Sequence, residues 1–414
     1  MFEELHLCPW ALVRHFNAPF AEERAHYLSY CAERGDSQAT LASKANRLIY
    51  VARQLSKCRN LDVAIERLGA VACGEKGRAL VWIQKLNKRW SQKKFLTVSR
   101  PWLRFLGWWR QPLVRQPFQE QLDEYCHWIR DLRGLTEGTI DTERRYVTQF
   151  LRWYAVKGRP LSQVRPIDVD RYLAEGGATR WCRISVRDVA TSLRAFFRYG
   201  ALRGWGPQHL PDSIQAPRVY AEETLPAGPD WIDVKRMMAA TNTDRAKDLR
   251  DRPILMLFAI YGLRATEVAR LQLENLDWER GLLHVTRVKR RGPQTYPLLP
   301  SLSEALIRYL KTVRRPSAHR EIFLGLQSPF LPLGHGGLYS LVSRRLTALG
   351  VRTAHHGPHS LRHACAARLV AEGLSLKEIG DHLGHRSASA TRIYAKVDLS
   401  GLRQVAAFDL GELL

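Results

Sequence analysis

The sequence predicts a mainly α-helical protein with a small β-sheet: a helical N-terminal domain, a helical bundle and a mixed α/β domain. Three observations support this class. Apolar residues recur three and four positions apart over most of the chain, as on one face of a helix. Strand-like runs form one pair, 282–285 and 295–298, around a basic turn. Four prolines fall within 206–228, where periodic apolar residues are few.

Residues 1–112 are expected to form the N-terminal helical domain, from apolar spacings such as Leu48, Val51, Leu55 and Leu80, Ile83, Leu86. The block ends in KKFLTVSRPWLRFLGWWRQP (93–112), where arginines alternate with tryptophans: Arg100, Arg104 and Arg110 with Trp102, Trp108 and Trp109. Two interpretations stay open for this run. It is either a helix whose tryptophans pack inward while its arginines face water, or an element that contacts DNA or docks a partner.

Residues 113–205 are expected to form a compact bundle of four helices. The first helix puts Leu122, Cys126 and Ile129 on one face, and the second ends before the Gly158–Pro160 segment. The faces expected to be exposed are rich in arginine: Arg144, Arg145, Arg152, Arg187, Arg194 and Arg198. Residues 206–228 are expected to be an extended linker.

Residues 229–414 are expected to form the mixed domain. The two strands flank a turn that projects Lys289, Arg290 and Arg291. The helices are expected over 230–240, 248–260, 264–272, 301–314, 337–349, 359–373, 375–383 and 388–396. The tail 397–414 also has near-helical apolar spacing.

The charge of the chain indicates a polyanionic partner. Lys and Arg number 64 against 40 Asp and Glu, which gives a formal net charge of +24. A charge this large concerns partners rather than fold. Interleaved arginine and tryptophan side chains suit phosphates and bases, so nucleic acid is the favoured partner.

The cysteines and the apolar segments indicate the cellular compartment of the protein. Seven scattered cysteines without a C-x-x-C pair argue against a disulfide framework or a zinc site, and suit a reducing cytoplasm. The acidic start MFEELHLCPW is unlike a signal peptide. The longest apolar run, 253–263, is too short to span a bilayer. We therefore expect a cytoplasmic protein without a membrane partner.

Three motifs of the mixed domain carry basic side chains. Arg264 starts an expected helix, where backbone N–H groups favour anions. His359 and Arg362 are three apart and share one face of a first helical turn. Lys289 stands on the basic turn. Taken singly, each has an ordinary alternative: a surface arginine, a chance His-x-x-Arg pair and a solvated turn.

The stretch LGHRSASATRIYAKVD (383–398) places His385 and Tyr394 nine residues apart. A tyrosine of ordinary pKa, near ~10, is a poor nucleophile at pH 7, so a packing role explains it equally well in isolation.

Together, in the order Arg, Lys, His-x-x-Arg, His, Tyr, these motifs resemble the tyrosine recombinase (phage integrase) family. The matching phrases are Gly262-Leu263-Arg264-x-x-Glu267, His359-x-Leu361-Arg362-His363, Leu383-Gly384-His385 and Thr391-x-x-Tyr394. The resemblance is strong over 229–398. It is weaker over 113–205, which looks like the core-binding domain of the family, and it does not extend to 1–112.

The resemblance implies a site-specific DNA recombinase or integrase that cleaves and rejoins strands through a 3′-phosphotyrosyl intermediate. Tyr394 would be the nucleophile, assisted by Arg264, Lys289, His359, Arg362 and His385. Glu267 would orient a basic group, and His363 would be structural. Residues expected to contact DNA are Arg144, Arg145, Arg187, Arg194, Arg290 and Arg291. The implied partners are double-stranded DNA and a homo-tetramer on it, alone or with other recombinases.

The chemistry needs neither a cofactor nor a metal. Two guanidinium forks, Arg264 and Arg362, match the charge that develops on the non-bridging phosphate oxygens. Lys289 would protonate the leaving 5′ oxygen, although Arg290 or Arg291 lies close enough to take that place. His359 would take the tyrosine proton or stabilise the phosphorane. The phosphotyrosyl link preserves the ester bond energy, so no ATP site is required.

Two other functions remain as alternatives. One is a type IB topoisomerase-like enzyme that relaxes DNA, and the other is a catalytically idle DNA-binding regulator on the same scaffold. For the recombinase, we expect that a mobile element carries its gene. We also expect that the protein associates with the nucleoid. The tail helix would pack either on its own domain or on a neighbouring subunit.

Overall fold

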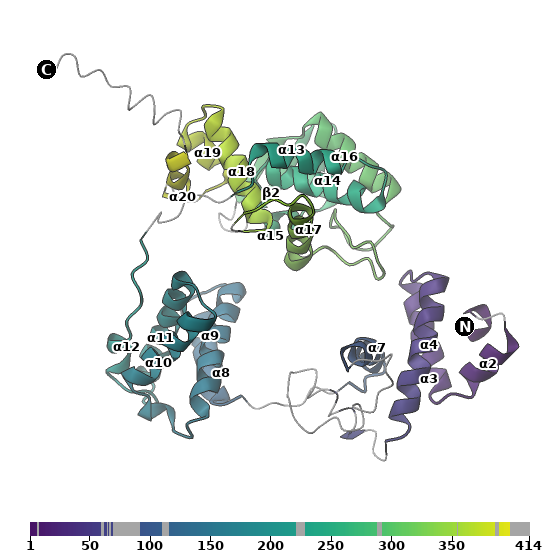
Figure 1. Ribbon diagram of the computed structural model, residues 1–414, viewed down its shortest axis with the longest axis horizontal. Helices are drawn as coiled ribbons and strands as arrows, with labels where there is room; N and C mark the ends of the chain where they lie inside the picture. Colours follow the sequence, from purple (N-terminus) through teal and green to yellow (C-terminus); the bar gives the residue numbers. More distant parts are fainter. Residues whose placement is uncertain are drawn as a thin grey trace. The chain divides into compact units, whose positions relative to one another are not determined.

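A computed structural model describes residues 1–5, 8–58, 62, 63, 65, 68, 92–109, 116–220, 228–287, 292–353, 355–385 and 389–397. The chain divides into two compact units. One comprises Ile65–Val81 and Arg110–Glu223, and the other Met1–Ala64, Trp82–Trp109 and Thr224–Leu414. Helices dominate both units, and the described strands form one three-stranded sheet, which confirms the predicted fold class (Figure 1). No described helix combines the length and the apolar character that crossing a membrane requires.

The N-terminal segment is helical, as predicted. Its helices include α1 (Phe2–Leu5), α2 (Pro9–Phe16), α3 (Ala21–Glu33), α4 (Gln38–Leu55) and α7 (Gln92–Phe105). Ser37 starts α4 by accepting a hydrogen bond from the Thr40 N–H, and Leu48, Val51 and Leu55 are buried on its inner face. Trp102 is fully buried and Arg104 is exposed, so inward packing describes this part of the Arg/Trp run. The expected helix face at Leu80, Ile83 and Leu86 lies outside the described residues.

The unit that spans 110–223 contains the four predicted helices. They are α8 (Gln119–Asp131), α9 (Glu137–Ala155), α10 (Pro166–Thr179) and α11 (Arg183–Leu202), with a 3₁₀ turn η2 (Leu161–Gln163) between α9 and α10. Leu122, Cys126 and Ile129 are buried, as predicted. The predicted extended linker over 206–228 is wrong in its first part. Helix α12 (Leu210–Ser213) forms there, because Leu210 and Ile214 pack into the core of this bundle.

The mixed domain surrounds a buried helix. Its elements before the sheet are α13 (Trp231–Ala240), α14 (Ala246–Ala259), α15 (Ala265–Ala269) and the 3₁₀ turn η3 (Leu273–Asn275). Helix α14 is charged in its first half and apolar from Pro253 to Ala259, and it packs against α16 (Pro300–Thr312) and α18 (Pro358–Ala371) (Figure 1). The remaining helices are α17 (His335–Ala348), α19 (Leu376–Leu383), α20 (Ser389–Arg392) and η4 (Ile393–Val397).

The sheet is antiparallel with the order β1-β2-β3. Its strands are β1 (Leu276–Asp277), β2 (Leu282–Arg287) and β3 (Gly292–Pro297). The predicted strand pair is confirmed, with Leu283 opposite Tyr296 and Arg287 opposite Gly292. Strand β1 was not predicted, since two residues are too few to show an alternating pattern.

Two predicted helices are shorter than expected. The helix expected over 264–272 ends at Ala269, because the chain beyond it pairs with a distant segment: Ile322 N–H donates to Leu271 O at 2.8 Å and Leu273 N–H to Arg320 O at 3.0 Å. The helix expected over 388–396 is a turn of α-helix followed by the tighter turn η4, which carries Tyr394. Both changes place site residues at the ends of short elements rather than inside long ones.

Candidate active site

Arg362 occupies the centre of the site. It projects from the first turns of α18 and is 2% exposed. Its Nη1 donates to Gly262 O at 2.5 Å and its Nη2 to Leu383 O at 2.8 Å. Burial and the neighbouring Arg264 lower the pKa of this guanidinium to about 10. It remains charged at pH 7, and N–H groups beyond these two bonds remain for an anion.

Arg264 lies beside it at the start of α15. Its Nη1 donates to Glu267 Oε1 at 2.9 Å and its Nη2 to Gly384 O at 3.2 Å. The expected anion site at this helix N-terminus is not supported, because α15 has five residues and Glu267 Oε2 accepts the Arg264 N–H at 2.8 Å. The expected contact of Glu267 with a basic group is confirmed by its ion pair with Arg264.

Two glycines allow the arginines to reach these carbonyls. Gly262 has φ +58°, and a Cβ there would lie 2.3 Å from Leu383 Cδ2. Gly384 has φ +65°, and a Cβ there would lie 2.6 Å from Arg287 Nε. Both positions therefore need the left-handed backbone and the missing side chain of glycine. This explains the glycine in each of the two motifs.

Tyr394 is buried against α18. It is 2% exposed, and its hydroxyl lies 2.9 Å from His363 Nδ1. Burial raises the pKa of the tyrosine to about 12, although Arg362 opposes the shift. Burial, followed by His359 and Arg362, lowers the pKa of His363 to about 4. His363 is thus neutral at pH 7, and its Nδ1 is hydrogen-bonded to the tyrosine hydroxyl, a contact that the sequence did not predict for this residue.

His385 and His359 lie on either side of this pair. His385 follows α19, its Nδ1 is 2.7 Å from Thr391 Oγ1, and its ring is parallel to that of Tyr394 with centroids 6.4 Å apart. Burial, Arg362 and Arg264 lower the pKa of His385 to about 4. His359 is exposed in the first turn of α18, as expected, and its ring centroid is 4.4 Å from that of His363.

The structure brings five of the six predicted catalytic residues together: Arg264, His359, Arg362, His385 and Tyr394. Lys289, Arg290 and Arg291 lie outside the described residues. In the helical bundle, Arg145 is exposed, Arg144 pairs with Asp123 at 3.2 Å and Arg187 with Asp188 at 2.8 Å. Arg194 donates to Ile214 O at 2.6 Å, so it holds the end of α12.

The contacts of two residues of the site, His363 and Arg287, were not predicted from the sequence. His363 is one helical turn beyond His359, and this spacing alone places both imidazoles on one face. Arg287 alternates with Leu283 and Val285 on the buried face of β2, and an arginine in that position was a signal of a buried ion pair. Its Nη1 donates to Glu267 Oε2 at 2.6 Å.

The arrangement suits attack of a hydroxyl on a phosphate ester. Two guanidinium groups lie where they could bind an anion, and a neutral imidazole is hydrogen-bonded to a buried tyrosine hydroxyl. Among the residues that the structure describes, no group of three or more His, Cys, Asp or Glu side chains could hold a metal ion.

Comparisons with known proteins agree on one family. The profile of the Phage integrase family matches residues 232–400. The chain is 32% identical over 293 residues to "Putative integrase/recombinase y4rA" of Sinorhizobium fredii, covering 70% of each chain. It is 28% identical over 296 residues to "Tyrosine recombinase XerC" of Thermodesulfovibrio yellowstonii, covering 69% of this chain and 95% of the relative.

Solved structures share the fold. The XerH site-specific recombinase bound to its palindromic difH substrate superposes with a TM-score of 0.54 at 16% identity, covering 84% of this chain and 95% of that one. The Tn1549 transposon integrase in complex with transposon right end DNA has a TM-score of 0.54 at 15% identity, covering 69% of this chain and 99% of that one.

Proposed function

Since the chain belongs to the phage integrase family of tyrosine recombinases, we propose that Tyr394 is its nucleophile and that His363 accepts the tyrosine proton. The enzyme cleaves and rejoins DNA strands through a tyrosine-linked intermediate. One observation carries the proposal: the buried Tyr394 hydroxyl lies 2.9 Å from His363 Nδ1, in a site whose phosphate-binding groups are the adjacent Arg362 and Arg264.

The cleavage step balances with the groups of this site. The Tyr394 oxygen bonds to phosphorus, the bond from phosphorus to the 5′ oxygen breaks, and the products are a 3′-phosphotyrosyl strand and a 5′-hydroxyl end. The tyrosine proton goes to His363, and Lys289 gives a proton to the leaving oxygen. Reversal with another 5′-hydroxyl joins the strands, and both protons return.

The two arginines would stabilise the transition state. Charge gathers on the non-bridging oxygens of the phosphorane, and each guanidinium keeps N–H groups beyond those that it donates to the protein. Because backbone carbonyls hold both forks in place, little reorganisation accompanies the reaction.

His385 would add a neutral donor. Its low pKa leaves it uncharged at pH 7, and in the tautomer whose Nδ1 accepts from the Thr391 hydroxyl, the proton of the ring stands on Nε2. That N–H is free for a phosphate oxygen. His359, in the first turn of α18, would reach the same phosphate from the exposed side.

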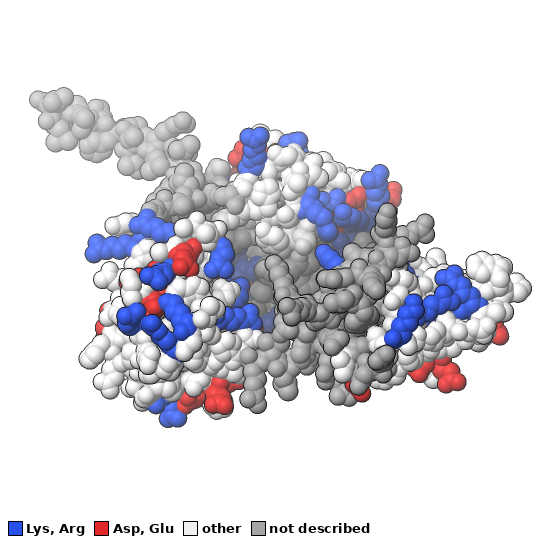
Figure 2. All heavy atoms as spheres, turned by 60° about the horizontal axis from the view of Figure 1, so that its bottom comes forward, with Lys and Arg blue, Asp and Glu red and all other residues white. Residues whose placement is uncertain are grey.

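Double-stranded DNA is the partner, and we propose that surface arginines of the helical bundle contact its backbone. Figure 2 shows Lys and Arg side chains in groups over the visible surface, with Asp and Glu between them. Arg145 is the best placed of the predicted residues because it is exposed and lies over the Tyr146 ring, 5.0 Å from its centroid. Arg144 and Arg187 would exchange a surface carboxylate for phosphate.

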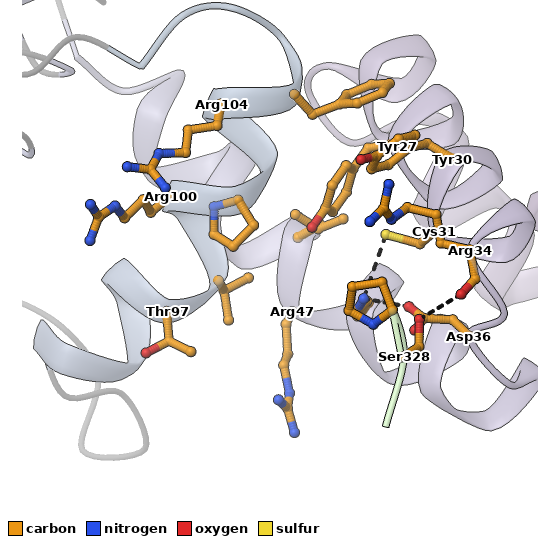
Figure 3. A pocket seen from close by; sticks show the side chains of 16 residues that line it. Tyr27, Tyr30, Cys31, Arg34, Asp36, Arg47, Thr97, Arg100, Arg104 and Ser328 are labelled. Carbon is orange, nitrogen blue, oxygen red and sulfur yellow. Dashed lines mark hydrogen bonds and ion pairs between the residues drawn. The ribbon is translucent and has the colours of Figure 1, made fainter. Parts of the chain in front are cut away.

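The N-terminal helices offer a second candidate surface for DNA. A hollow of about 790 Å³ lies beside α3, α4 and α7, and basic and aromatic side chains line it (Figure 3). The basic residues are Arg34, Lys44, Arg47, Arg100 and Arg104, and the aromatic residues are Tyr27, Tyr30 and Phe105. Its one acidic side chain, Asp36, is paired with Lys44. Tyr27 is buried, but Tyr30 and Phe105 are exposed, and positive charge beside exposed rings suits phosphates and bases.

A salt titration tests this surface with a matched pair of variants on α4. Arg47→Gln removes a lining cation, whereas Arg53→Gln removes an exposed cation that does not line the hollow. We expect only Arg47→Gln to reduce the slope of log Kd against log salt, by roughly 0.9 for one lost phosphate contact. Equal slopes for both variants would exclude the surface.

We also propose a homo-tetramer on DNA and a gene carried by a mobile element. Because its partner is DNA, we propose that the protein associates with the nucleoid. The proposal of assembly rests on the additional N-terminal helices and on the apolar tail, whose residues 398–414 lie outside the described part. Packing of the tail on its own or a neighbouring subunit therefore stays a prediction. The molar mass of the complex on a duplex with two sites would test the tetramer.

Trapping of a covalent adduct tests the function. Duplexes are first selected from a random pool by binding to the Tyr394→Phe variant, and a nick beside the cleavage position then prevents rejoining. We expect a protein–DNA adduct with the wild type and with Tyr309→Phe, which removes another buried hydroxyl of the domain, but not with Tyr394→Phe. Tight binding of the duplex without any adduct of the wild type would refute the proposed enzymatic activity. Relaxation of a supercoiled plasmid without exchange would favour the topoisomerase-like alternative.

A further inference from the structure

Arg287 is a charged side chain in a position that ordinarily holds an apolar one. It ends β2 on the same face as Leu283 and Val285, and it is 1% exposed. Burial of an ionised group is costly unless partners compensate for the lost water. The partners of Arg287 therefore indicate what the residue does.

All three nitrogens of this guanidinium donate to protein groups. Nη1 donates to Glu267 Oε2 at 2.6 Å, and Nε donates to Gln294 Oε1 at 2.8 Å. Nη2 donates to the Tyr296 hydroxyl and to His382 O, the latter at 3.1 Å. Since each nitrogen already has a partner, Arg287 is suited to hold other groups in place rather than to bind DNA.

The first group that it holds is the partner of Arg264. Glu267 shares its carboxylate between the two arginines, with Oε1 on Arg264 and Oε2 on Arg287. Glu267 and Arg264 alone would have no net charge. With Arg287 the cluster carries one positive charge, and the shorter contact of the carboxylate is with Arg287, at 2.6 Å against 2.9 Å to Arg264. Arg264 then keeps its attraction for a phosphate.

The second group is the turn that leads to His385. Three successive backbone carbonyls each accept from a different arginine: His382 O from Arg287, Leu383 O from Arg362 and Gly384 O from Arg264. Gln294 also holds this turn, because its Nε2 donates to Asp381 O at 2.7 Å and to His382 O at 3.3 Å. The turn thus fixes the spacing of the two phosphate-binding arginines, and Arg287 anchors its first residue.

We propose that Arg287 is a positioning residue, which sets the net charge around Arg264 and anchors the 382–384 turn that aligns Arg264 and Arg362. The inference rests on the proposed role of these two arginines. It predicts that Arg287 governs the rate of strand cleavage while contributing little to DNA affinity.

Two variants test the proposal: one removes the charge of Arg287, and the other removes the charges of both Arg287 and Glu267. In Arg287→Met, the carboxylate of Glu267 has only Arg264 left, so we expect single-turnover cleavage to slow by about 10–100-fold, with the Kd for the selected nicked duplex within about threefold. In the double variant Glu267→Gln/Arg287→Met, both buried charges are gone and the cluster recovers its net positive charge, now carried by Arg264 alone. We expect the double variant to cleave faster than Arg287→Met, by about tenfold.

Arg345→Met is the matched control. Arg345 is a mostly buried arginine of the same domain, held by Asp248 at 2.5 Å and Asp251 at 2.6 Å, and neither carboxylate contacts Arg264 or Arg362. We expect this variant to lower Tm without slowing cleavage at a temperature where it is folded. If Arg287→Met does not fold, Arg287→Lys replaces it, because lysine keeps the charge but cannot span Glu267, Gln294 and His382 O.

The outcomes separate this inference from the proposed function. A wild-type adduct that Tyr394→Phe abolishes, together with Arg287 variants that cleave within about twofold of the wild type, would overturn the inference alone. A loss no larger than that of Arg345→Met, or a double variant slower than Arg287→Met, would also overturn it. Absence of any wild-type adduct would instead refute the proposed function.

Discussion

Replacement of Arg362 by lysine tests how the phosphate-binding arginines are held. The guanidinium donates from two different nitrogens, to Gly262 O at 2.5 Å and to Leu383 O at 2.8 Å. The side chain is buried, and a single ammonium group cannot reproduce a planar fork that reaches both carbonyls. At least one carbonyl therefore loses a charged donor, and the phosphate loses the bidentate geometry.

The expected magnitudes follow from these contacts. A hydrogen bond to a charged group contributes about 1.5–3 kcal/mol, so the free energy of unfolding should fall by about 2 kcal/mol. For a domain of this size, that loss lowers Tm by roughly 4–8 °C. Loss of one preorganised donor should slow cleavage by ~10²–10³-fold.

Thermal unfolding and single-turnover cleavage of the nicked duplex measure the two effects. Arg368→Lys is the control, since Arg368 lies on the same helix, is 44% exposed and pairs with Glu372 on the surface. A surface pair of this kind is worth about 0–1 kcal/mol, so this variant should behave as the wild type. An Arg362→Lys enzyme with unchanged Tm and wild-type cleavage would refute the assignment of both carbonyl contacts.

Three further predictions concern the turn, the histidines and the basic hairpin. Gly384→Ala should cost about 1–2 kcal/mol of backbone strain and should also slow cleavage, because its Cβ would lie 2.6 Å from Arg287 Nε; Gly350→Ala, at φ +67° in open space, should show the strain without the loss of cleavage. The pKa values of His363 and His385 are lowered from 6.5 to about 4, so the unfolded state takes up these protons first and stability is lost as pH falls from about 6.5 towards 4. Urea unfolding should show a loss of about 1–2 kcal/mol per histidine between pH 7 and pH 5, and His363→Gln should reduce the loss; equal stability at both values would contradict the burial of neutral imidazoles. Lys289→Ala should slow cleavage by ~10²–10⁴-fold and Arg290→Ala far less, and the reverse order would reassign the proton donor.

Local patterns predicted much of the fold. Apolar spacing identified the buried faces of α4 and α8, because a helix repeats its contacts every three or four residues. The same spacing overextended α15, since its end is decided by pairing with residues 320–322, some fifty positions away along the chain. Sequence patterns do not contain contacts at that separation.

The sequence likewise predicted some features of the candidate site and not others. Motif order placed Arg264, Arg362 and Tyr394 in one site, and the structure brings them together. It could not reveal that three consecutive carbonyls hold three arginines, because those pairs join residues from 21 to 120 positions apart. His363 was expected to be structural, and its contact with Tyr394 was not predicted. Its helical spacing from His359 was visible, but its partner Tyr394 is 31 residues away.

Identification of the residue that carries the DNA tests the central claim most directly. The adduct formed on the nicked duplex is digested with nuclease and protease, and the peptide that retains a nucleotide is sequenced by mass spectrometry. Tyr394, whose hydroxyl lies 2.9 Å from His363 Nδ1, should carry the 3′-phosphate. A nucleotide attached to any other residue of the wild-type chain, or an adduct of normal yield in Tyr394→Phe, would contradict the account.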